Sequence, residues 1–126
     1  MLGNHDAVAT VAVRDLNAAS RFYGETLGLT RIHTEGEEAI TYQGGSSQLI
    51  VYRSQYAGTN RATAVTWDVG DELDEIIRTL KAKDVAFEHY DMPDAHLEGD
   101  VHVFGSLRVA WFRDPDGNIH SLYSES

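Results

Sequence analysis

The feature that most limits what this chain can fold into is an internal repeat. The first copy is an apolar segment from Ala7, followed after Asp15 by a helical stretch that continues to Leu27. The second copy is an apolar segment from Ala64, followed by a helical stretch to Lys83. Because self-similarity at a separation of a few tens of residues marks a repeated supersecondary unit, we expect the same unit twice.

Each helical stretch is followed by strand-like segments separated by turn residues. These segments are 29–34, 39–43 and 48–53 in the first copy, and 85–90, 107–113 and 118–123 in the second. The sequence Asp-Pro-Asp-Gly before the last segment fits a type I turn. The order β-α-β-β-β, twice, predicts an α+β fold: one domain over residues 1–126, with modules at 7–55 and 64–124. The polar stretch 91–105 is interpreted as a lid or cover over a site.

The helix boundaries have recognisable signals. Asp15 and Asp71 are interpreted as N-caps or first-turn acids, where a carboxylate is favoured by the helix dipole. Gly28 is a natural C-cap for the first helix. In the second helix the apolar residues recur at the spacing of one helical face, which predicts an amphipathic helix; they are Leu73, Ile76, Ile77 and Leu80.

Alternation along the strands predicts which sheet face is buried. Val11 and Val13 alternate with smaller or polar residues, and Trp67 does the same in the second copy. Because a sheet buries its more hydrophobic face, these residues should pack beneath the helices. The opposite face would then line a ligand cavity; the alternative is a solvated outer face. The predicted ligand-binding residues are Thr10, Ala12, Ala64, Thr66, Asp68, Trp111, Ser121 and Tyr123.

Composition excludes several classes of partner and site. The formal net charge of -10 opposes binding to nucleic acid and to anionic membranes. The absence of cysteine excludes disulfides and thiolate metal sites. No basic start followed by an apolar run is present, and no apolar segment is long enough to cross a bilayer, so we expect a cytoplasmic protein.

Two motifs give the chain a resemblance to a known family. Residues 13–23 (VRDLNAASRFY), followed by Leu-Gly-Leu at 27–29, are similar to the first-module signature of the vicinal-oxygen-chelate superfamily, which contains glyoxalases, bleomycin-resistance proteins and dioxygenases. Residues 112–118 (FRDPDGN) are similar to its last-strand signature. The likeness extends from Ala7 to Tyr123. It implies a glyoxalase/bleomycin-resistance fold, in which the two modules form a curled mixed sheet around a concave cavity.

The resemblance also implies three metal-ligand positions, and their residues do not suit a metal. These positions fall at Val8, Ala64 and Ser121, none of which is a ligand of first-row metals. A shift by one residue offers only His120, which would point to the opposite face of its strand. We therefore expect no metal and no cofactor, and the metal-dependent isomerase and dioxygenase mechanisms of the family to be absent.

Two further groups of residues have competing interpretations. In an extended chain His96, Glu98, Asp100 and His102 would project to one side and could bind zinc, but scattered histidines in an acidic stretch are more often solvated. Asp68 is a weak candidate for a catalytic base on the concave face.

The alternative for Asp68 is an ion pair with Arg53, Arg113 or another cation, which is the commoner role of such a carboxylate.

The leading hypothesis is a protein that binds a small organic molecule in its cupped sheet without the family metal. The alternative is a lyase, isomerase or dioxygenase-type enzyme of the same superfamily with a non-standard acid/base or metal site, and a helper domain without a ligand is a third possibility. Whether a reaction is catalysed stays open at this point. Open edge strands need partners. Members of the family that this chain resembles pair their modules within one chain or between two chains, so we expect a homodimer.

Overall fold

The computed structural model describes residues 1–125, and the chain has an α+β fold with two mixed sheets over that range. It divides into two compact units, Met1–Thr59 and a second unit that begins at Asn60. Each unit contains one of the sheets. No helix within residues 1–125 is long and apolar enough to cross a membrane.

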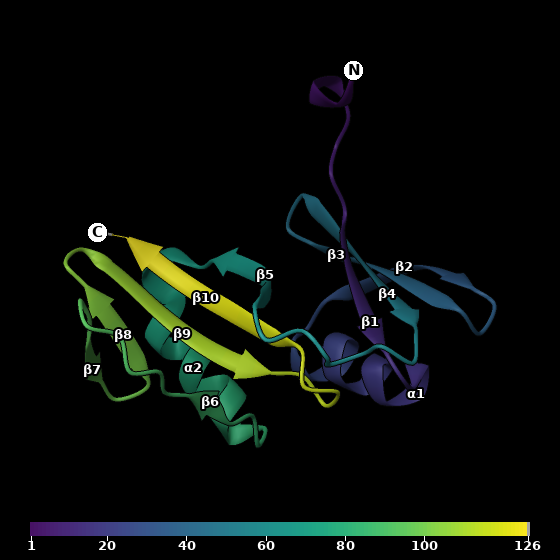
Figure 1. Ribbon diagram of the computed structural model, residues 1–126. Helices are drawn as coiled ribbons and strands as arrows, with labels where there is room; N and C mark the ends of the chain where they lie inside the picture. The colour runs from purple at the N-terminus through teal and green to yellow at the C-terminus, as the bar shows by residue number, and fades with distance from the viewer. Residues whose placement is uncertain (126) are drawn as a thin grey trace. The chain divides into compact units, whose positions relative to one another are not determined.

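The first unit is a four-stranded sheet with a helix on one face (Figure 1). A short exposed turn, η1 (Leu2–Asn4), precedes the elements β1 (Ala9–Val13), α1 (Leu16–Ala19), η2 (Ser20–Thr26), β2 (Thr30–Glu35), β3 (Ala39–Gly44) and β4 (Ser47–Arg53). The strand order is β1-β4-β3-β2, in which β1 is parallel to β4 and the other pairs are antiparallel. The helix-side core consists of Val11, Val13, Ala19, Phe22, Tyr23, Ile40, Tyr42, Leu49 and Val51.

Local signals set the ends of the first helix as predicted. The Asp15 carboxylate accepts hydrogen bonds from the amides of Asn17 (2.8 Å) and Ala18 (3.4 Å), which satisfies N–H groups that have no partner within the helix. Gly28 follows the helix with a φ of 77°, a left-handed conformation that glycine adopts without a steric penalty. The helix widens into a π-helical turn, η2, which the sequence pattern did not predict.

The second unit repeats the plan with additional strands. Its elements are β5 (Thr63–Asp68), η3 (Gly70–Glu72), α2 (Leu73–Ala82), β6 (Phe87–Glu88), β7 (His96–Glu98), β8 (Val101–Phe104), β9 (Leu107–Arg113) and β10 (Ile119–Glu125). The order is β5-β10-β9-β8-β7, with β5 parallel to β10 and with β6 paired to β9 beside β8. In Figure 1, α2 lies across one face of this sheet.

The predicted amphipathic stripe faces this sheet. Leu73, Ile77 and Leu80 are buried, and Ile76 is half-buried. The sheet face beneath α2 is rich in rings: Trp67 stacks on Phe112 with 6.3 Å between centroids. Asp71 lies in the η3 turn that leads into α2 and makes no capping contact of the kind that Asp15 makes.

The interpretation of residues 91–105 as a lid or cover is wrong for most of its length. Residues 96–104 form the β7–β8 hairpin, and β8 pairs with β9 in the sheet, so that Val101, His102 and Val103 are buried. The predicted strand 85–90 is correspondingly reduced to the two residues of β6. The pairing of β8 depends on β9, which lies further along the chain, and local polarity does not reveal such a partner.

Candidate functional site

The predicted site residues of the second unit lie together on the sheet face opposite α2. Ser121 is in register with Thr66 on one side and with Trp111 on the other. Two residues further along β10, Tyr123 is in register with Asp68. Residues in register share a face of the sheet, as do residues two apart on one strand. We therefore call the following five residues the polar face: Thr66, Asp68, Trp111, Ser121 and Tyr123. Ala64 lies on the same side of β5 and is exposed.

Hydroxyl groups tie the polar face together. The hydroxyl oxygens of Thr66 and Ser121 are 2.7 Å apart and share a hydrogen bond. Thr66 is exposed, whereas Ser121 is only 3% exposed, so Ser121 is less open than its interpretation as a cleft residue implied. Thr66 therefore presents the more accessible surface of the pair.

Asp68 contacts Gly70 and Tyr123, and no ion pair joins it to a cation within residues 1–125. One carboxylate oxygen accepts a hydrogen bond from the Gly70 amide (3.2 Å), and the charge and hydrogen bond of Asp68 raise the pKa of the Tyr123 hydroxyl above its usual value. The two arginines considered as partners pair elsewhere, Arg53 with Glu38 and Arg113 with Glu88. The predicted ion pair of Asp68 with Arg113 is therefore wrong, and Arg53 pairs with Glu38 inside the first unit.

The two predicted residues of the first unit lie on β1. Thr10 is exposed and Ala12 is half-buried, on the face opposite the buried Val11 and Val13. The alternation predicted for this strand is confirmed. A pocket of about 440 Å³ in the same unit is lined by Arg14, Arg31 and Arg53 together with Asp15 and Glu37, so opposite charges mix there and favour no particular charged ligand.

Trp111 connects the polar face to two residues that the sequence analysis did not assign to the site. Its indole N–H donates to the Thr63 hydroxyl at 3.0 Å. Its ring lies edge-on to the rings of Tyr90 (5.3 Å) and His102 (4.8 Å). The register places His102 opposite Val109 of β9, on the side of Trp111. No local sequence signal identifies these neighbours, because they depend on the pairing of β8 and β9.

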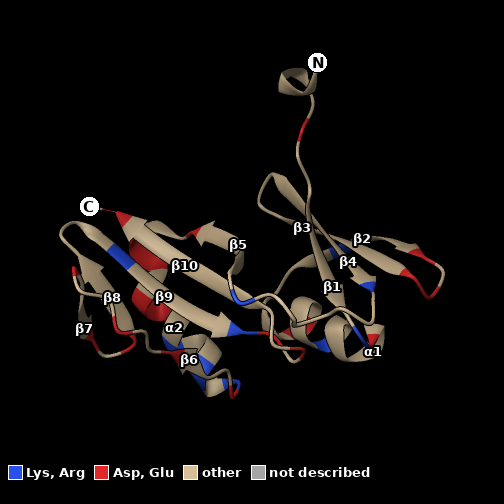
Figure 2. Ribbon diagram, viewed as in Figure 1, with Lys and Arg blue, Asp and Glu red and all other residues tan. Residues whose placement is uncertain are grey.

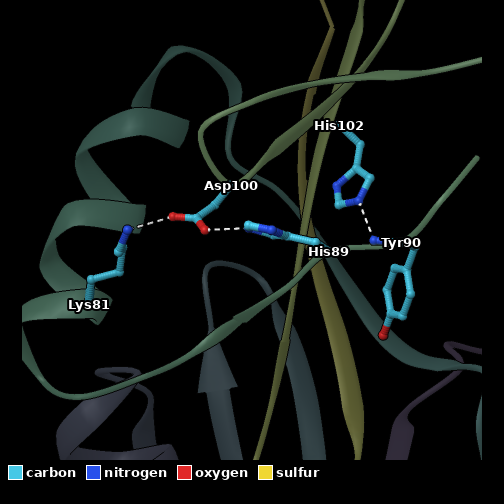
Figure 3. Close-up of polar contacts among 5 residues, drawn as sticks. All are labelled: Lys81, His89, Tyr90, Asp100 and His102. Carbon is cyan, nitrogen blue, oxygen red and sulfur yellow. Dashed lines mark hydrogen bonds and ion pairs between the residues drawn. The ribbon is translucent and has the colours of Figure 1, made fainter.

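His102 is buried beside a pocket. The ring is 1% exposed, and its Nε2 accepts a hydrogen bond of 2.9 Å from the Tyr90 amide (Figure 3). The pocket has a volume of about 380 Å³. Its lining residues are His89, Tyr90, Asp91, Met92, Ala95, His96, Leu97 and His102.

The predicted cluster of alternating histidines and acids is divided by the β7–β8 turn. Asp100 accepts hydrogen bonds from Lys81 (2.7 Å) and contacts His89 (2.8 Å), and these contacts lower the pKa of its carboxyl group (Figure 3). His96 contacts Glu98 at 3.0 Å. The prediction that the four residues project to one side is wrong, and residues 1–125 contain no group of three or more ligand residues placed to hold a metal.

The three positions at which the family would carry metal ligands do not fit a divalent cation. Val8 and Ala64 have no donor atom in their side chains, and the Ser121 hydroxyl is occupied by Thr66. His120 lies on the opposite face, as predicted: it is 0% exposed, and its ring meets Trp67 and Phe112 edge-on at 5.6 Å. Burial lowers the pKa of His120 from 6.5 to about 4.

The chain matches one protein family, and many solved structures have a fold similar to its own. The family model described as Glyoxalase/Bleomycin resistance protein/Dioxygenase superfamily matches residues 6–121. No curated protein matches the chain. Lactoylglutathione lyase from Agrobacterium tumefaciens is similar in structure, with a TM-score of 0.71 and 18% identity over 95% of this chain and 92% of that one.

The fosfomycin resistance protein FosX from Listeria monocytogenes has a TM-score of 0.74 and 16% identity, over 97% of this chain and 93% of that one. A FosX structure complexed with Mn(II) and sulfate has a TM-score of 0.72 and 16% identity, over 100% and 93% of the two chains. At these identities the likeness concerns the fold.

Proposed function

This chain belongs to the Glyoxalase/Bleomycin resistance protein/Dioxygenase superfamily, and we propose that it binds a small organic molecule on the polar face of its second unit, without a metal. The observation that carries the proposal is the pairing of Ser121 with Thr66 through their hydroxyls, at 2.7 Å. Ser121 stands where the family resemblance implies a metal ligand, and its hydroxyl is engaged by Thr66 instead. The face keeps hydroxyl groups and an indole ring for ligand contact, and residues 1–125 place no group of three or more ligand residues there to hold a metal ion.

The chemistry of the polar face favours binding over bond cleavage. Thr66, Ser121 and Tyr123 supply hydroxyls, Trp111 supplies a half-buried ring, and Asp68 is the one carboxylate among the five. Sites for small molecules combine apolar and aromatic walls with a few placed polar groups, which this face resembles. Of the five, Asp68 is the group that an enzymatic alternative would use as its base.

Binding at the polar face is tested by closing it with a bulky side chain. In a Trp67→Phe background, Trp111 is the single tryptophan, so its fluorescence reports on this face. A screen of small aromatic molecules is expected to give saturable quenching, and Thr66→Phe is expected to weaken the binding of any hit at least about tenfold by filling the space above Ser121.

Thr30→Phe is the matched control, since Thr30 is an exposed strand threonine in the first unit. Hits that bind the Thr66→Phe variant as tightly as the control would place the ligand elsewhere and remove the proposal.

Metal independence gives a separate prediction. Addition of one equivalent of zinc, nickel, manganese or ferrous iron is expected to leave the melting temperature unchanged, because a ligand raises apparent stability only if it binds the native state. Differential scanning fluorimetry measures this, with elemental analysis of protein purified without chelator alongside. A saturable rise at one equivalent would contradict metal independence and revive a metal-dependent enzyme.

Assembly as a homodimer is proposed from the family resemblance and from the open edge strands. A cytoplasmic location is proposed from the sequence, in which no apolar segment is long enough to cross a bilayer. Light scattering at micromolar concentration measures the mass directly.

A further inference from the structure

His102 holds a hydrogen-bond donor that has no partner among the residues that the structure describes. The Tyr90 amide donates to Nε2, so that nitrogen must present a lone pair. The single ring proton of the neutral imidazole is then on Nδ1. Nδ1 is buried and has no hydrogen-bond partner among residues 1–125. A buried donor left without an acceptor destabilises the folded protein, so such a group normally meets a ligand or water.

His102 lines a pocket that is large enough for a ligand carrying an acceptor. Its volume of about 380 Å³ is that of a small organic molecule, and Met92, Ala95 and Leu97 give it apolar walls. Tyr90 also lines it, but Figure 3 shows the phenol of Tyr90 directed away from the His102 ring. The hydroxyl of Tyr90 is therefore not the acceptor for Nδ1.

The charges around the pocket select against an anion. Asp91 lines it, and its two exposed histidines, His89 and His96, are each held by a carboxylate, Asp100 and Glu98. Lys81, on α2, is the cation in contact with this group, and Asp100 occupies it. Figure 2 shows acidic residues on α2 and around the β7–β8 turn. A neutral acceptor avoids the repulsion that a carboxylate or phosphate would meet here.

We propose that the pocket lined by His102 and by residues 89–92 and 95–97 receives the carbonyl oxygen of a neutral small molecule, which accepts a hydrogen bond from Nδ1–H of His102. The inference rests on the proposed function, and it names the chemical group of the ligand that the protein recognises. The ring of Trp111, on the polar face, contacts both His102 and Tyr90, so one molecule can cover the polar face and extend into the pocket.

Three probes of similar size separate the candidate chemistries: acetophenone (neutral carbonyl), benzoate (anion) and ethylbenzene (no acceptor). Long-range ¹⁵N NMR of ring-labelled histidines is expected to show His102 as the Nδ1–H tautomer and to show its Nδ1 signal moving on addition of acetophenone. Acetophenone should bind about tenfold more tightly than ethylbenzene, the value of one well-made hydrogen bond. Benzoate should bind more weakly than acetophenone.

His102→Phe keeps a ring but removes the donor, and should bring acetophenone and ethylbenzene to within about twofold of each other. His102→Asn, which returns an N–H near Nδ1, should restore part of the preference. The tautomer measurement uses the unaltered protein and so decides the point even if a variant fails to fold.

An Nε2–H tautomer, equal binding of ethylbenzene and acetophenone, stronger binding of benzoate, or no binding of acetophenone up to its solubility limit would each overturn the inference. An Nδ1 signal that no probe moves would assign the acceptor to a bound water only. If Thr66→Phe abolishes binding of hits while His102→Phe leaves their order unchanged, the polar face remains the site and the His102 inference alone fails.

Discussion

Replacement of Phe112 by alanine is expected to lower the free energy of unfolding by about 3–5 kcal/mol, the usual cost of removing a fully buried aromatic side chain. Phe112 is 0% exposed and lies between three other rings on the α2 side of the sheet, at 6.3 Å from Trp67, 5.8 Å from Phe87 and 5.6 Å from His120. Its removal opens a cavity that these rigid rings cannot close. Urea denaturation measures the change as a shift of the midpoint at constant slope.

The adjacent residue on β9 provides the matched control. Trp111 has a larger ring but lies on the polar face and is only half-buried. Trp111→Ala is therefore expected to cost clearly less than Phe112→Ala, although it deletes more atoms. The reverse order would mean that the two faces of β9 are assigned the wrong way round.

The second large effect is a loss of stability in acid caused by His120. Its pKa is about 4 in the folded protein and 6.5 as an ordinary histidine, so the folded state disfavours the proton that the unfolded chain accepts. Above pH 6.5 His120 is neutral in both states, and its full contribution to the free energy of unfolding is present. As the pH falls from 6.5 toward 4, the unfolded chain takes up the proton first, and about 3 kcal/mol of the free energy of unfolding is lost in total. The cause is burial, which the nearby Asp114 carboxylate partly offsets.

His120→Gln isolates this contribution, because glutamine is polar and of similar reach but does not titrate. The free energy of unfolding, measured between pH 7.5 and 4, should fall more steeply in the unaltered protein than in the variant. The difference should develop between pH 6.5 and 4. Parallel curves would show that His120 is protonated in the folded state and that its surroundings are more polar than its burial indicates.

The histidines illustrate what periodicity could and could not predict. His120 was placed on the helix-facing side of the last strand by alternation alone, and its burial confirms this. The sequence pattern places His102 in a polar stretch that is either solvated or zinc-binding, yet it is 1% exposed, because β8 pairs with β9 and carries it into the sheet. Its surroundings depend on a contact between strands, and the residues on either side of it in the chain do not encode that contact.

The candidate site shows the same division. Thr66, Trp111 and Ser121 are assigned to one ligand-binding set from the sequence, and the register places the three residues on the same face of the sheet. The hydroxyl contact that joins Thr66 to Ser121 could not be predicted, since residues 66 and 121 meet only through the parallel pairing of β5 with β10. The ion pairs of Arg53 and Arg113 were likewise decided by strand neighbours.

By itself, the sequence determined the family, the repeated strand-helix order, the first helix with its Asp15 cap, and the more buried face of each leading strand. These depend on side-chain chemistry at short separations, where a period of two or 3.6 residues or a single cap is sufficient. Only the tertiary structure decided that residues 96–104 form a hairpin, that Nδ1 of His102 lacks a partner, and that Ser121 is enclosed. Those features arise from pairing between distant strands, whose free energy comes from partners that a local pattern does not contain.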